Sequence, residues 1–423
     1  MQKDNSLLNS RRFLPLFGIQ AFNALTDHVL KNAILVMITY HGLSIYGLSR
    51  EISLNLATLS FILPFFLFSS YAGKLADTYS KVKLIRIIKT CELGIVFIAA
   101  LSFILHSLAL MIFSLVIIGI HSTFFSPIKY SILPQYFDER KALLLANGYI
   151  EFATFVFVLF GQFLGSWYMA NKQIYIIIAL LAGSSLIGLV LSFVMEKTPA
   201  IGSKNKLNWN MLKDTFALKR EILQNKAIHN NLRAISWFWA LGVIYTTQLP
   251  IFTESYMGGS ARIYSIMLAL FSISIGLGSI ICAKISNGKI EPKYVLVGSG
   301  GVSLFSFILL AINYHPHQQF LDIYEFSCTF KGVVNYLLIF GVGIASGFYS
   351  VTCYNELQVI SPLNILSQVV AVNNIMNAIA MIVAAACCAV LLFFINIWWL
   401  LLFTMLVNLI FCYWYWSHKF KVS

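Results

Sequence analysis

Long apolar stretches recur along nearly the whole chain of 423 residues and are separated by short polar segments. A helix needs about 20 predominantly apolar residues to cross a bilayer, and each stretch reaches that length. The pattern therefore predicts an all-α integral membrane protein. The predicted spans are residues 13–39, 52–76, 84–106, 108–134, 144–169, 173–195, 230–251, 260–283, 294–313, 331–355, 367–394 and 397–416, twelve in all.

The composition supports a membrane location, because 59% of the residues are hydrophobic and only 11% are charged. A soluble domain carries about a quarter charged residues. The net charge of +13 does not indicate a nucleic-acid partner, since the basic residues lie in loops and form no single stripe. The sequence contains no phosphate-cradling, zinc-ligating or serine-hydrolase motif. We therefore expect no enzymatic activity, no cofactor and no metal.

The distribution of lysine and arginine predicts the orientation in the membrane. Residues 196–229 are polar and rich in lysine, and they form the natural linker between two halves, 1–195 and 230–423. Loops rich in basic residues stay in the cytoplasm, so we place the linker and both termini there. The loops assigned to the cytoplasm carry Lys74, Lys81, Lys83, Arg140, Lys141, Lys284, Lys289 and Lys293. The opposite loops hold few basic residues, and Cys328 is the cysteine expected in one of them.

The two halves echo each other in sequence. Residues 146–151 open the fifth span with Ala-Asn-Gly-Tyr-Ile-Glu, and residues 372–377 read Val-Asn-Asn-Ile-Met-Asn early in the eleventh. Each follows a segment of the type Tyr-x-x-Leu-x-Gln, at residues 130–135 and 354–358, with one residue of difference in spacing. A duplicated half of six spans is typical of rocker-type transporters.

The loop after the second span carries a motif. Residues 73–83 read Gly-Lys-Leu-Ala-Asp-Thr-Tyr-Ser-Lys-Val-Lys, so that Gly73 and Asp77 lie four residues apart on one helix face. The segment resembles the signature loop of the major facilitator superfamily, Gly-x-x-x-Asp-Arg/Lys-x-Gly-Arg/Lys. Thr78 and Ser80 depart from that pattern.

The resemblance implies a gating role for this loop. In the superfamily the aspartate helps to latch the two halves in one conformation, which assigns that role to Asp77 with Gly73. Lys81 and Lys83 follow at the membrane surface and either take part in gating or only set the topology.

Residues 20–33 carry a second resemblance, in the order Gln-Ala-Phe-Asn-Ala-Leu-Thr-Asp-His-Val-Leu-Lys-Asn-Ala. This segment is similar to the first helix of the bacterial lysophospholipid transporter family, which typically reads Gln-Phe-Leu-x-Ala-Phe-x-Asp-Asn, often followed by Phe-Lys-Asn-Ala. Asp27 and Lys31 match that pattern, and Thr26 and His28 depart from it.

Segments in both halves extend this resemblance over almost the whole chain. They are residues 126–130, 146–151, 276–279, 289–291 and 373–374, with departures at Thr352 and Glu356. The resemblance implies a bacterial inner-membrane protein that moves lysophospholipid without ATP. Because the family also occurs fused to acyltransferase and acyl-carrier-protein synthetase domains, it also implies a cytoplasmic acylating partner.

Ionisable residues at membrane depth are costly, and each is a functional hypothesis by default. Asn23, Asp27 and Lys31 recur at four-residue spacing and lie on one face of the first span.

Glu151 shares a helix face with Asn147, about 10 Å into the fifth span at 1.5 Å per residue. Lys129 reaches a similar depth in the fourth span, so Lys129 and Glu151 could pair across neighbouring helices.

These residues suit a zwitterionic lipid headgroup such as that of lysophosphatidylethanolamine. Lys31 or Lys129 can meet the phosphate as a point charge, and Asp27 or Glu151 can meet the amine. The competing interpretation of Lys129 and Glu151 is an internal salt bridge that holds helices together and never contacts cargo.

Several other polar residues have simpler explanations. Glu92 and His121 are single polar groups in apolar spans, and we expect each to make an interhelical hydrogen bond. Glu356, near the inner end of its span, is expected to reach the lipid headgroups. Residues 161–165, Gly-x-x-x-Gly, indicate close helix packing. Residues 317–322 have the His-x4-Asp spacing of acyltransferases, which we treat as chance because the loop has no room for that domain.

The sequence thus favours a lysophospholipid transporter with an alternating cavity and a polar track for the headgroup. Two other hypotheses remain open. One is a proton-coupled transporter of another small polar or amphipathic solute, with Asp27 or Glu151 carrying the proton. The other is a membrane scaffold for a cytoplasmic acyltransferase that moves no lipid.

Overall fold

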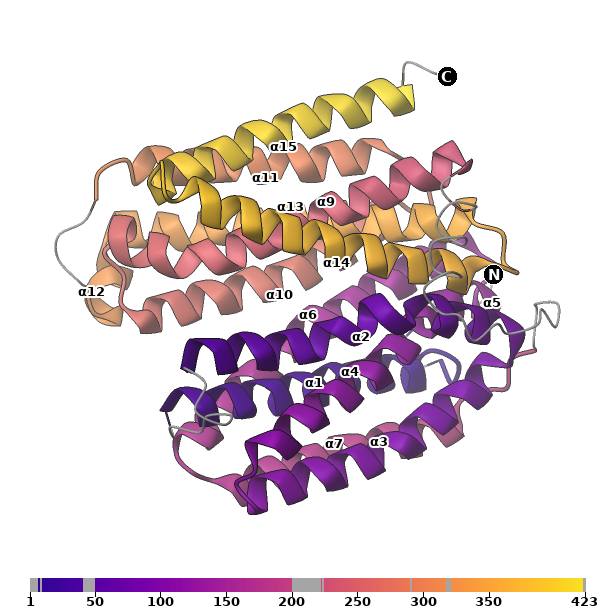
Figure 1. The fold of residues 1–423 in the computed structure, drawn as a ribbon. Helices are drawn as coiled ribbons and strands as arrows, with labels where there is room; N and C mark the ends of the chain where they lie inside the picture. Colours follow the sequence, from indigo (N-terminus) through magenta and orange to yellow (C-terminus); the bar gives the residue numbers. More distant parts are fainter. Residues whose placement is uncertain are drawn as a thin grey trace. The chain divides into compact units, whose positions relative to one another are not determined.

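A computed structural model describes residues 7, 10–40, 50–199, 222, 224–289, 291–316 and 321–420. Over these residues the chain is almost entirely helical (Figure 1). The long helices are α1 (Leu14–Tyr40), α2 (Arg50–Thr78), α3 (Lys81–Ile104), α4 (Leu108–Ser131), α6 (Arg140–Ala170), α7 (Ile174–Val194), α9 (Lys226–Phe252), α10 (Ala261–Ile285), α11 (Lys293–Ile312), α13 (Phe330–Ile360), α14 (Leu366–Leu391) and α15 (Ile397–Phe420). Three short helices are α5 (Leu133–Tyr136), η2 (Thr253–Met257) and α12 (Ile323–Cys328).

Each predicted span corresponds to one of these long helices, so the all-helical fold class is confirmed. In the described part of the chain, 11 helices are long and apolar enough to cross a membrane. The remaining long helix is α1, in which Asn23, Asp27, His28 and Lys31 reduce the apolar character. Asn23, Asp27 and Lys31 are among the residues that the sequence singled out for function.

Tight turns join neighbouring helices and fix their antiparallel order. His106 lies between α3 and α4 with φ 51°, and Lys172 lies between α6 and α7 with φ 59°. These are left-handed backbone conformations, which a residue other than glycine adopts at some cost in free energy. Ser107 then caps α4 by accepting a hydrogen bond from the backbone N–H of Leu110.

The described helices form two compact units. The first comprises Met1–Asp138, Val156–His229 and Gln358–Ile375, and the second comprises Glu139–Phe155, Asn230–Leu357 and Met376–Ser423. Helices α6, α9, α13 and α14 each contribute to both units. The predicted domain division at residues 196–229 remains a prediction, and residues 200–221 and 223 of that linker lie outside the described residues.

In the first unit α2 packs on α4, α1 packs on α7, and α3 contacts both α4 and α7. Its apolar core includes Val29, Phe103 and Leu115. The Gly161 and Gly165 motif of α6 lies against α1, where a Cβ at Gly165 would be 2.6 Å from the carbonyl oxygen of Val29. Close packing by these small residues is as predicted.

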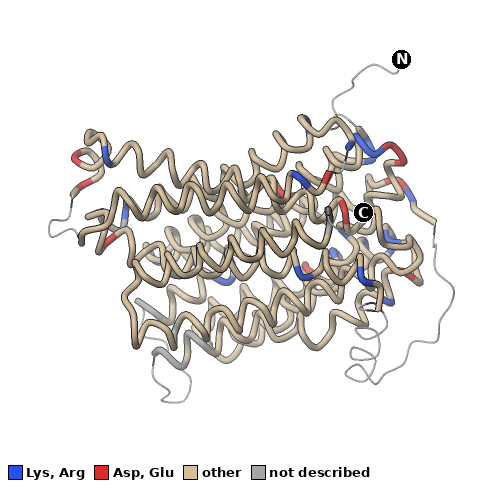
Figure 2. The backbone as a smooth tube through the Cα atoms, turned by 90° about the horizontal axis from the view of Figure 1, so that it is seen from above, with Lys and Arg blue, Asp and Glu red and all other residues tan. Residues whose placement is uncertain are grey.

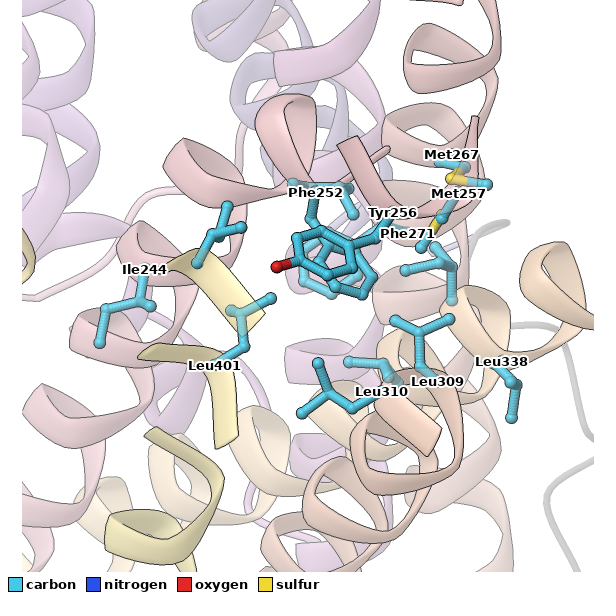
Figure 3. Close-up of a cluster of buried hydrophobic side chains, with 14 of the residues drawn as sticks. Ile244, Phe252, Tyr256, Met257, Met267, Phe271, Leu309, Leu310, Leu338 and Leu401 are labelled. Atoms are coloured by element: carbon cyan, nitrogen blue, oxygen red, sulfur yellow. The ribbon is translucent and has the colours of Figure 1, made fainter. Parts of the chain in front are cut away.

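In the second unit α11 packs against α15. A large cluster of buried apolar side chains fills this unit, as Figure 3 shows. At its centre the rings of Phe252 and Tyr256 stack with their centroids 5.4 Å apart.

Charged residues gather near helix ends, and the middles of most helices are free of them (Figure 2). Large apolar side chains such as Phe97, Phe193 and Ile410 are exposed on helix surfaces. Exposed apolar side chains of this kind suit contact with lipid chains. A protein surface in water rarely exposes so many of them together. Which helix ends face the cytoplasm remains a prediction.

Candidate functional site

Asp27 of α1 lies at a contact between α1 and α4. The side-chain amide of Asn23 donates to Asp27 Oδ2 at 3.1 Å, across one helical turn. Ser122 of α4 donates its hydroxyl to the same oxygen at 2.5 Å. Asp27 is only 6% exposed, so its carboxylate sits in a low-dielectric environment within the first unit.

Lys89 of α3 also belongs to this site. Its Nζ donates to Asn23 Oδ1 and to Glu92 Oε2, both at 2.7 Å, and the side chain is fully buried. The Lys89 ammonium also lies 5.3 Å from the ring centroid of Phe125. Gly188 of α7 packs against the lysine, since a Cβ there would lie at an ordinary contact distance of 3.5 Å from Lys89 Cδ.

Lys89 was not among the residues predicted from the sequence. The signal for it was present, since Lys89 and Glu92 stand three residues apart on one helix face and can pair there. The interpretation of Glu92 as a single polar group is therefore wrong.

His121 of α4 faces the same carboxylate. Its Nε2 lies 3.7 Å from Glu92 Oε2, which is close enough for an ion pair if the imidazole is protonated. Neither ring nitrogen of His121 has a hydrogen-bond partner in the described part of the chain. His121 therefore lies beside a charged carboxylate and does not make the expected interhelical hydrogen bond among the described residues.

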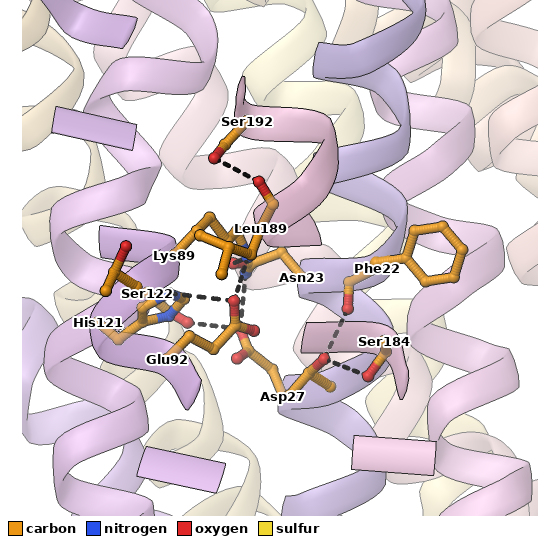
Figure 4. Close-up of polar contacts among 12 residues, drawn as sticks. Phe22, Asn23, Asp27, Lys89, Glu92, His121, Ser122, Ser184, Leu189 and Ser192 are labelled. Carbon is orange, nitrogen blue, oxygen red and sulfur yellow. Dashed lines mark hydrogen bonds and ion pairs between the residues drawn. The ribbon is translucent and has the colours of Figure 1, made fainter. Parts of the chain in front are cut away.

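We call this group the Lys89 cluster, and its members are Asn23, Asp27, Lys89, Glu92, His121 and Ser122 (Figure 4). It joins α1, α3 and α4 and holds both signs of charge a few ångströms apart. Asp27 Oδ1 and Glu92 Oε1 are buried there without hydrogen-bond partners among the described residues. Such a cluster can bind a cation, a proton or a zwitterion.

Lys31, the third residue of the predicted face on α1, contacts an aromatic ring of α2. Its Nζ is 5.6 Å from the ring centroid of Phe61 on α2, and the side chain is partly exposed. Of the three residues predicted on this face of α1, Asn23 and Asp27 contact each other, and Lys31 contacts Phe61 of α2.

Lys129 and Glu151 belong to different compact units. Lys129 of α4 is in the first unit, where its Nζ lies 4.8 Å from the ring centroid of Tyr130. Glu151 of α6 is in the second unit and is 1% exposed. The predicted pair of Lys129 with Glu151 would join the two units and remains a prediction.

Asn147 of α6 is fully buried in the second unit. Its amide nitrogen donates to Asn355 Oδ1 of α13 at 2.8 Å and to the carbonyl oxygen of Leu143 at 3.1 Å. Asn355 was not predicted, because nothing in its local sequence shows that α13 and α6 meet there.

Glu356 is the next residue of α13. The prediction that it contacts lipid headgroups is wrong. It is 8% exposed and accepts hydrogen bonds from Asn231 at 3.0 Å and from the Tyr415 hydroxyl at 3.2 Å. The side chain turns inward because α9 and α15 present these donors.

Asp77 of α2 is the predicted gating residue, and its side chain lies against the N-terminus of α14. Its carboxylate accepts the backbone N–H of Ser367 at 3.0 Å and that of Gln368 at 3.1 Å. An anion is stabilised at a helix N-terminus by the unpaired N–H groups and the helix dipole. Gly73 makes the approach possible, since a Cβ there would lie 2.8 Å from both Ala371 Cβ and the Ser367 carbonyl oxygen.

The two lysines after Asp77 differ in environment. Lys81 is buried, lies 3.7 Å from Asp77 Oδ1 and donates to the carbonyl oxygen of Ala76 at 2.8 Å. Lys83 is exposed. Only Lys81 is therefore placed to act on the aspartate. Asp322 of the His-x4-Asp segment caps α12, and His317 lies outside the described residues.

Known proteins resemble this chain in sequence and in fold. The sequence profile of the Major Facilitator Superfamily matches residues 16–385. A lysophospholipid transporter of Photorhabdus laumondii is 26% identical over 271 residues, which cover 62% of this chain and 63% of that protein, just under two thirds of its length. A lysophospholipid transporter of Klebsiella pneumoniae is 24% identical over 70% of this chain and 72% of its own. The predicted resemblance to the lysophospholipid transporter family is confirmed.

Other relatives carry different names. A staphyloferrin A transporter of Staphylococcus aureus is 25% identical over 66% of this chain and 68% of its own. Among solved structures, that of the human organic anion transporter MFSD10 superposes with a TM-score of 0.73 at 12% identity, covering 96% of this chain and 99% of the other. That likeness concerns the fold.

Proposed function

This chain belongs to the Major Facilitator Superfamily and is a membrane transporter, and from this premise we propose that its cargo is a lysophospholipid. The proposed direction is from the outer to the inner leaflet of a bacterial inner membrane, by alternating access. The observation that carries the proposal is the buried Lys89 cluster, which holds charges of both signs in a unit built from apolar helices.

The headgroup of lysophosphatidylethanolamine has the complementary charges. Its ammonium would pair with Asp27, whose Oδ1 is buried without a hydrogen-bond partner among the described residues. Its phosphate would be met by Lys31 or Lys129, and Asn23 would orient Asp27. In the second unit, Asn147 and Glu151 would continue the polar track. The single acyl chain would stay against apolar helix faces or lipid.

The gate would be the contact of Asp77 with the first turn of α14. This contact consists of a few charge-assisted hydrogen bonds, which a small difference in free energy can break. Gly73 sets the distance, and the buried Lys81 balances the aspartate charge. Lys83 would act at the membrane surface.

A cytoplasmic acyltransferase or acyl-carrier-protein synthetase would consume the lysophospholipid after transport. Such a partner would keep the inner concentration low and drive net movement without ATP. We place both termini in the cytoplasm beside this partner, following the distribution of basic residues.

A proton-coupled transporter of another small polar or amphipathic solute is the second candidate. A cargo other than lysophospholipid is favoured by the staphyloferrin A transporter, whose identity to this chain is similar to that of the lysophospholipid transporters. The two candidates differ in their response to the membrane proton gradient.

The test follows radiolabelled lysophosphatidylethanolamine from the outer face into spheroplasts that contain the wild type, Asp27→Asn or Lys129→Ala at equal expression. Lipid transport predicts uptake that survives a protonophore and collapses in either variant. Uptake abolished by the protonophore would keep the lipid cargo and show that the proton gradient drives its transport. No uptake by the wild type would refute the lipid cargo, and undiminished uptake in both variants would refute the proposed track.

A further inference from the structure

Lys31 of α1 is a cation without a carboxylate partner in the described part of the chain. Its neighbours Val29, Leu30 and Ile34 on the same helix are fully buried. Helix α1 ends at Tyr40, about 14 Å further along its axis at 1.5 Å per residue, so the lysine side chain does not extend to the membrane surface at that end. An unpaired charge at this depth is costly and indicates a function.

The nearest carboxylate on the same helix does not pair with Lys31. Asp27 precedes it by four residues, the spacing at which an aspartate and a lysine usually pair on a helix. The Asp27 carboxylate instead accepts hydrogen bonds from Asn23 and Ser122. The Lys31 ammonium lies over the ring of Phe61 on α2, 5.6 Å from its centroid. Since an aromatic ring attracts a cation less strongly than a carboxylate does, the lysine retains most of its capacity to bind an anion.

His28 shares this side of α1 and packs on the same ring. The centroid of its imidazole lies 6.5 Å from that of Phe61. Its Nδ1 is buried and has no hydrogen-bond partner among the described residues. Gly161 brings α6 close to α1 at this point, because a Cβ there would lie 2.8 Å from His28 Cβ. The imidazole is therefore placed between neighbouring helices, and the N–H of its neutral form can donate to a ligand oxygen.

The two side chains together suit an oxyanion. Lys31 and His28 are three residues apart on α1, so they lie on adjoining turns of one helix face. An ammonium and an imidazole N–H can donate to two oxygens of one phosphate or carboxylate group, and such charge-assisted hydrogen bonds are strong. A cationic ligand would be repelled by Lys31, and an uncharged ligand would leave its charge unbalanced. Lys31 is partly exposed, so a ligand can reach it.

We propose that Lys31 and His28 form a subsite for one oxyanion, distinct from the Lys89 cluster. The identity of the oxyanion rests on the proposed function, under which it is the phosphodiester of the lysophospholipid. The lipid ammonium would then lie at Asp27, one helical turn or about 6 Å away along α1. The two-carbon bridge of ethanolamine joins charges that are separated by a similar distance. The side chains of Asp27 and Lys31 remain apart so that the cargo can pair with both.

The subsite is tested by equilibrium binding of three lipids with the same single acyl chain to the purified full-length protein. Lysophosphatidylethanolamine carries phosphate and amine, lysophosphatidylglycerol carries phosphate only, and monoacylglycerol carries neither. Lys31→Met should weaken binding of both phospholipids about tenfold or more and leave monoacylglycerol binding unchanged. Asp27→Asn should weaken binding of lysophosphatidylethanolamine alone.

Variants of His28 test the second donor. His28→Leu removes the N–H and should weaken binding of both phospholipids by a smaller factor than Lys31→Met. His28→Asn introduces the residue that is typical of the lysophospholipid transporter family at this position and keeps an N–H donor, so it should bind close to wild type. The matched control is Lys172→Met, which removes an exposed lysine in the turn between α6 and α7 and should not change binding of any of the three lipids.

Thermal denaturation of the cargo-free protein separates a binding role of Lys31 from a structural one. Because the charge has no partner, Lys31→Met should raise the denaturation temperature while it weakens binding, as expected where function is kept at a cost in stability. A lysine that stabilises the fold through an ion pair would give the opposite sign. The proposal is overturned if Lys31→Met lowers the denaturation temperature, if it leaves phospholipid binding unchanged, or if it weakens monoacylglycerol binding equally.

The subsite can be examined even if the wild type binds no lysophospholipid, a result that would refute the proposed function. The probes are then inorganic phosphate and citrate, because an anion that binds the native state raises the denaturation temperature. A rise that is present in the wild type and in Lys172→Met but absent in Lys31→Met would assign the subsite to the oxyanion of another solute. No rise that depends on Lys31 with either probe would overturn the subsite as well.

Discussion

Lys89 is linked to two buried carboxylates. It contacts Glu92 directly, and it holds Asn23, which in turn donates to Asp27. Removing one partner of a buried ion pair leaves an uncompensated charge, which costs about 3–5 kcal/mol. We therefore expect Lys89→Met to lower the free energy of unfolding by about that amount, measured by thermal denaturation of the purified protein in detergent.

The matched control for this prediction is Lys83→Met on the same helix. Lys83 is exposed, so its replacement should change stability by less than about 0.5 kcal/mol. Equal effects of the two substitutions would show that Lys89 does not compensate the carboxylates.

Asn147 and Asn355 make the corresponding polar contact in the second unit. Asn147→Ala would leave the buried Asn355 Oδ1 without its donor, at a cost of about 1–3 kcal/mol. Combining Asn147→Ala with Asn355→Leu removes both polar groups, and we expect the double variant to lose less stability than the sum of the single losses. A double-mutant cycle of denaturation energies measures this, and strict additivity would contradict the prediction.

At the scale of helices, the contact between α2 and α14 sets the proposed gate. Asp77→Asn keeps the shape of the side chain and removes the charge that the N-terminus of α14 stabilises. Hydrogen bonds to charged groups contribute about 1.5–3 kcal/mol, and every 1.4 kcal/mol is about tenfold in an equilibrium. We therefore expect the population with this contact open to rise about tenfold or more.

The opening is measured by maleimide labelling of Ala371→Cys in a background without the exposed native cysteines. Ala371 is fully buried and lies where a Cβ at Gly73 would meet it. Asp77→Asn should accelerate the labelling, and Asp138→Asn, which neutralises an exposed loop carboxylate, should not. Equal labelling rates in all three proteins would argue against the gate.

The local parts of this architecture could be predicted from the sequence, and the contacts across long separations could not. Apolar length alone predicts the helices, and four-residue spacing alone predicts that Asn23 and Asp27 meet. In contrast, Asp77 and Ser367 are 290 residues apart in the chain. Their contact depends on how α14 packs, which no local pattern encodes. Lys89 was missed for a related reason, because its role depends on α1 arriving beside it.

The largest-scale prediction is the orientation of the protein in the membrane. It follows from the distribution of basic residues and can be measured directly. Cys328 ends α12 and is exposed, and the predicted topology places it outside the cell. A thiol reacts with maleimide through its thiolate, which needs water, so an impermeant maleimide reports which side of the membrane a loop occupies. In intact spheroplasts we expect a variant that retains only Cys328 to be labelled at once.

The matched control carries Cys328→Ser together with Arg140→Cys, at the exposed start of α6, which the same topology places in the cytoplasm. This variant should be labelled only after the membrane is permeabilised. Because basic loops are held on the cytoplasmic side, the two outcomes are linked: if the orientation is correct, both must hold. The reverse labelling pattern would invert the whole protein and would place the gate at Asp77 on the outer face. The direction proposed for lipid movement would then have to be reversed as well.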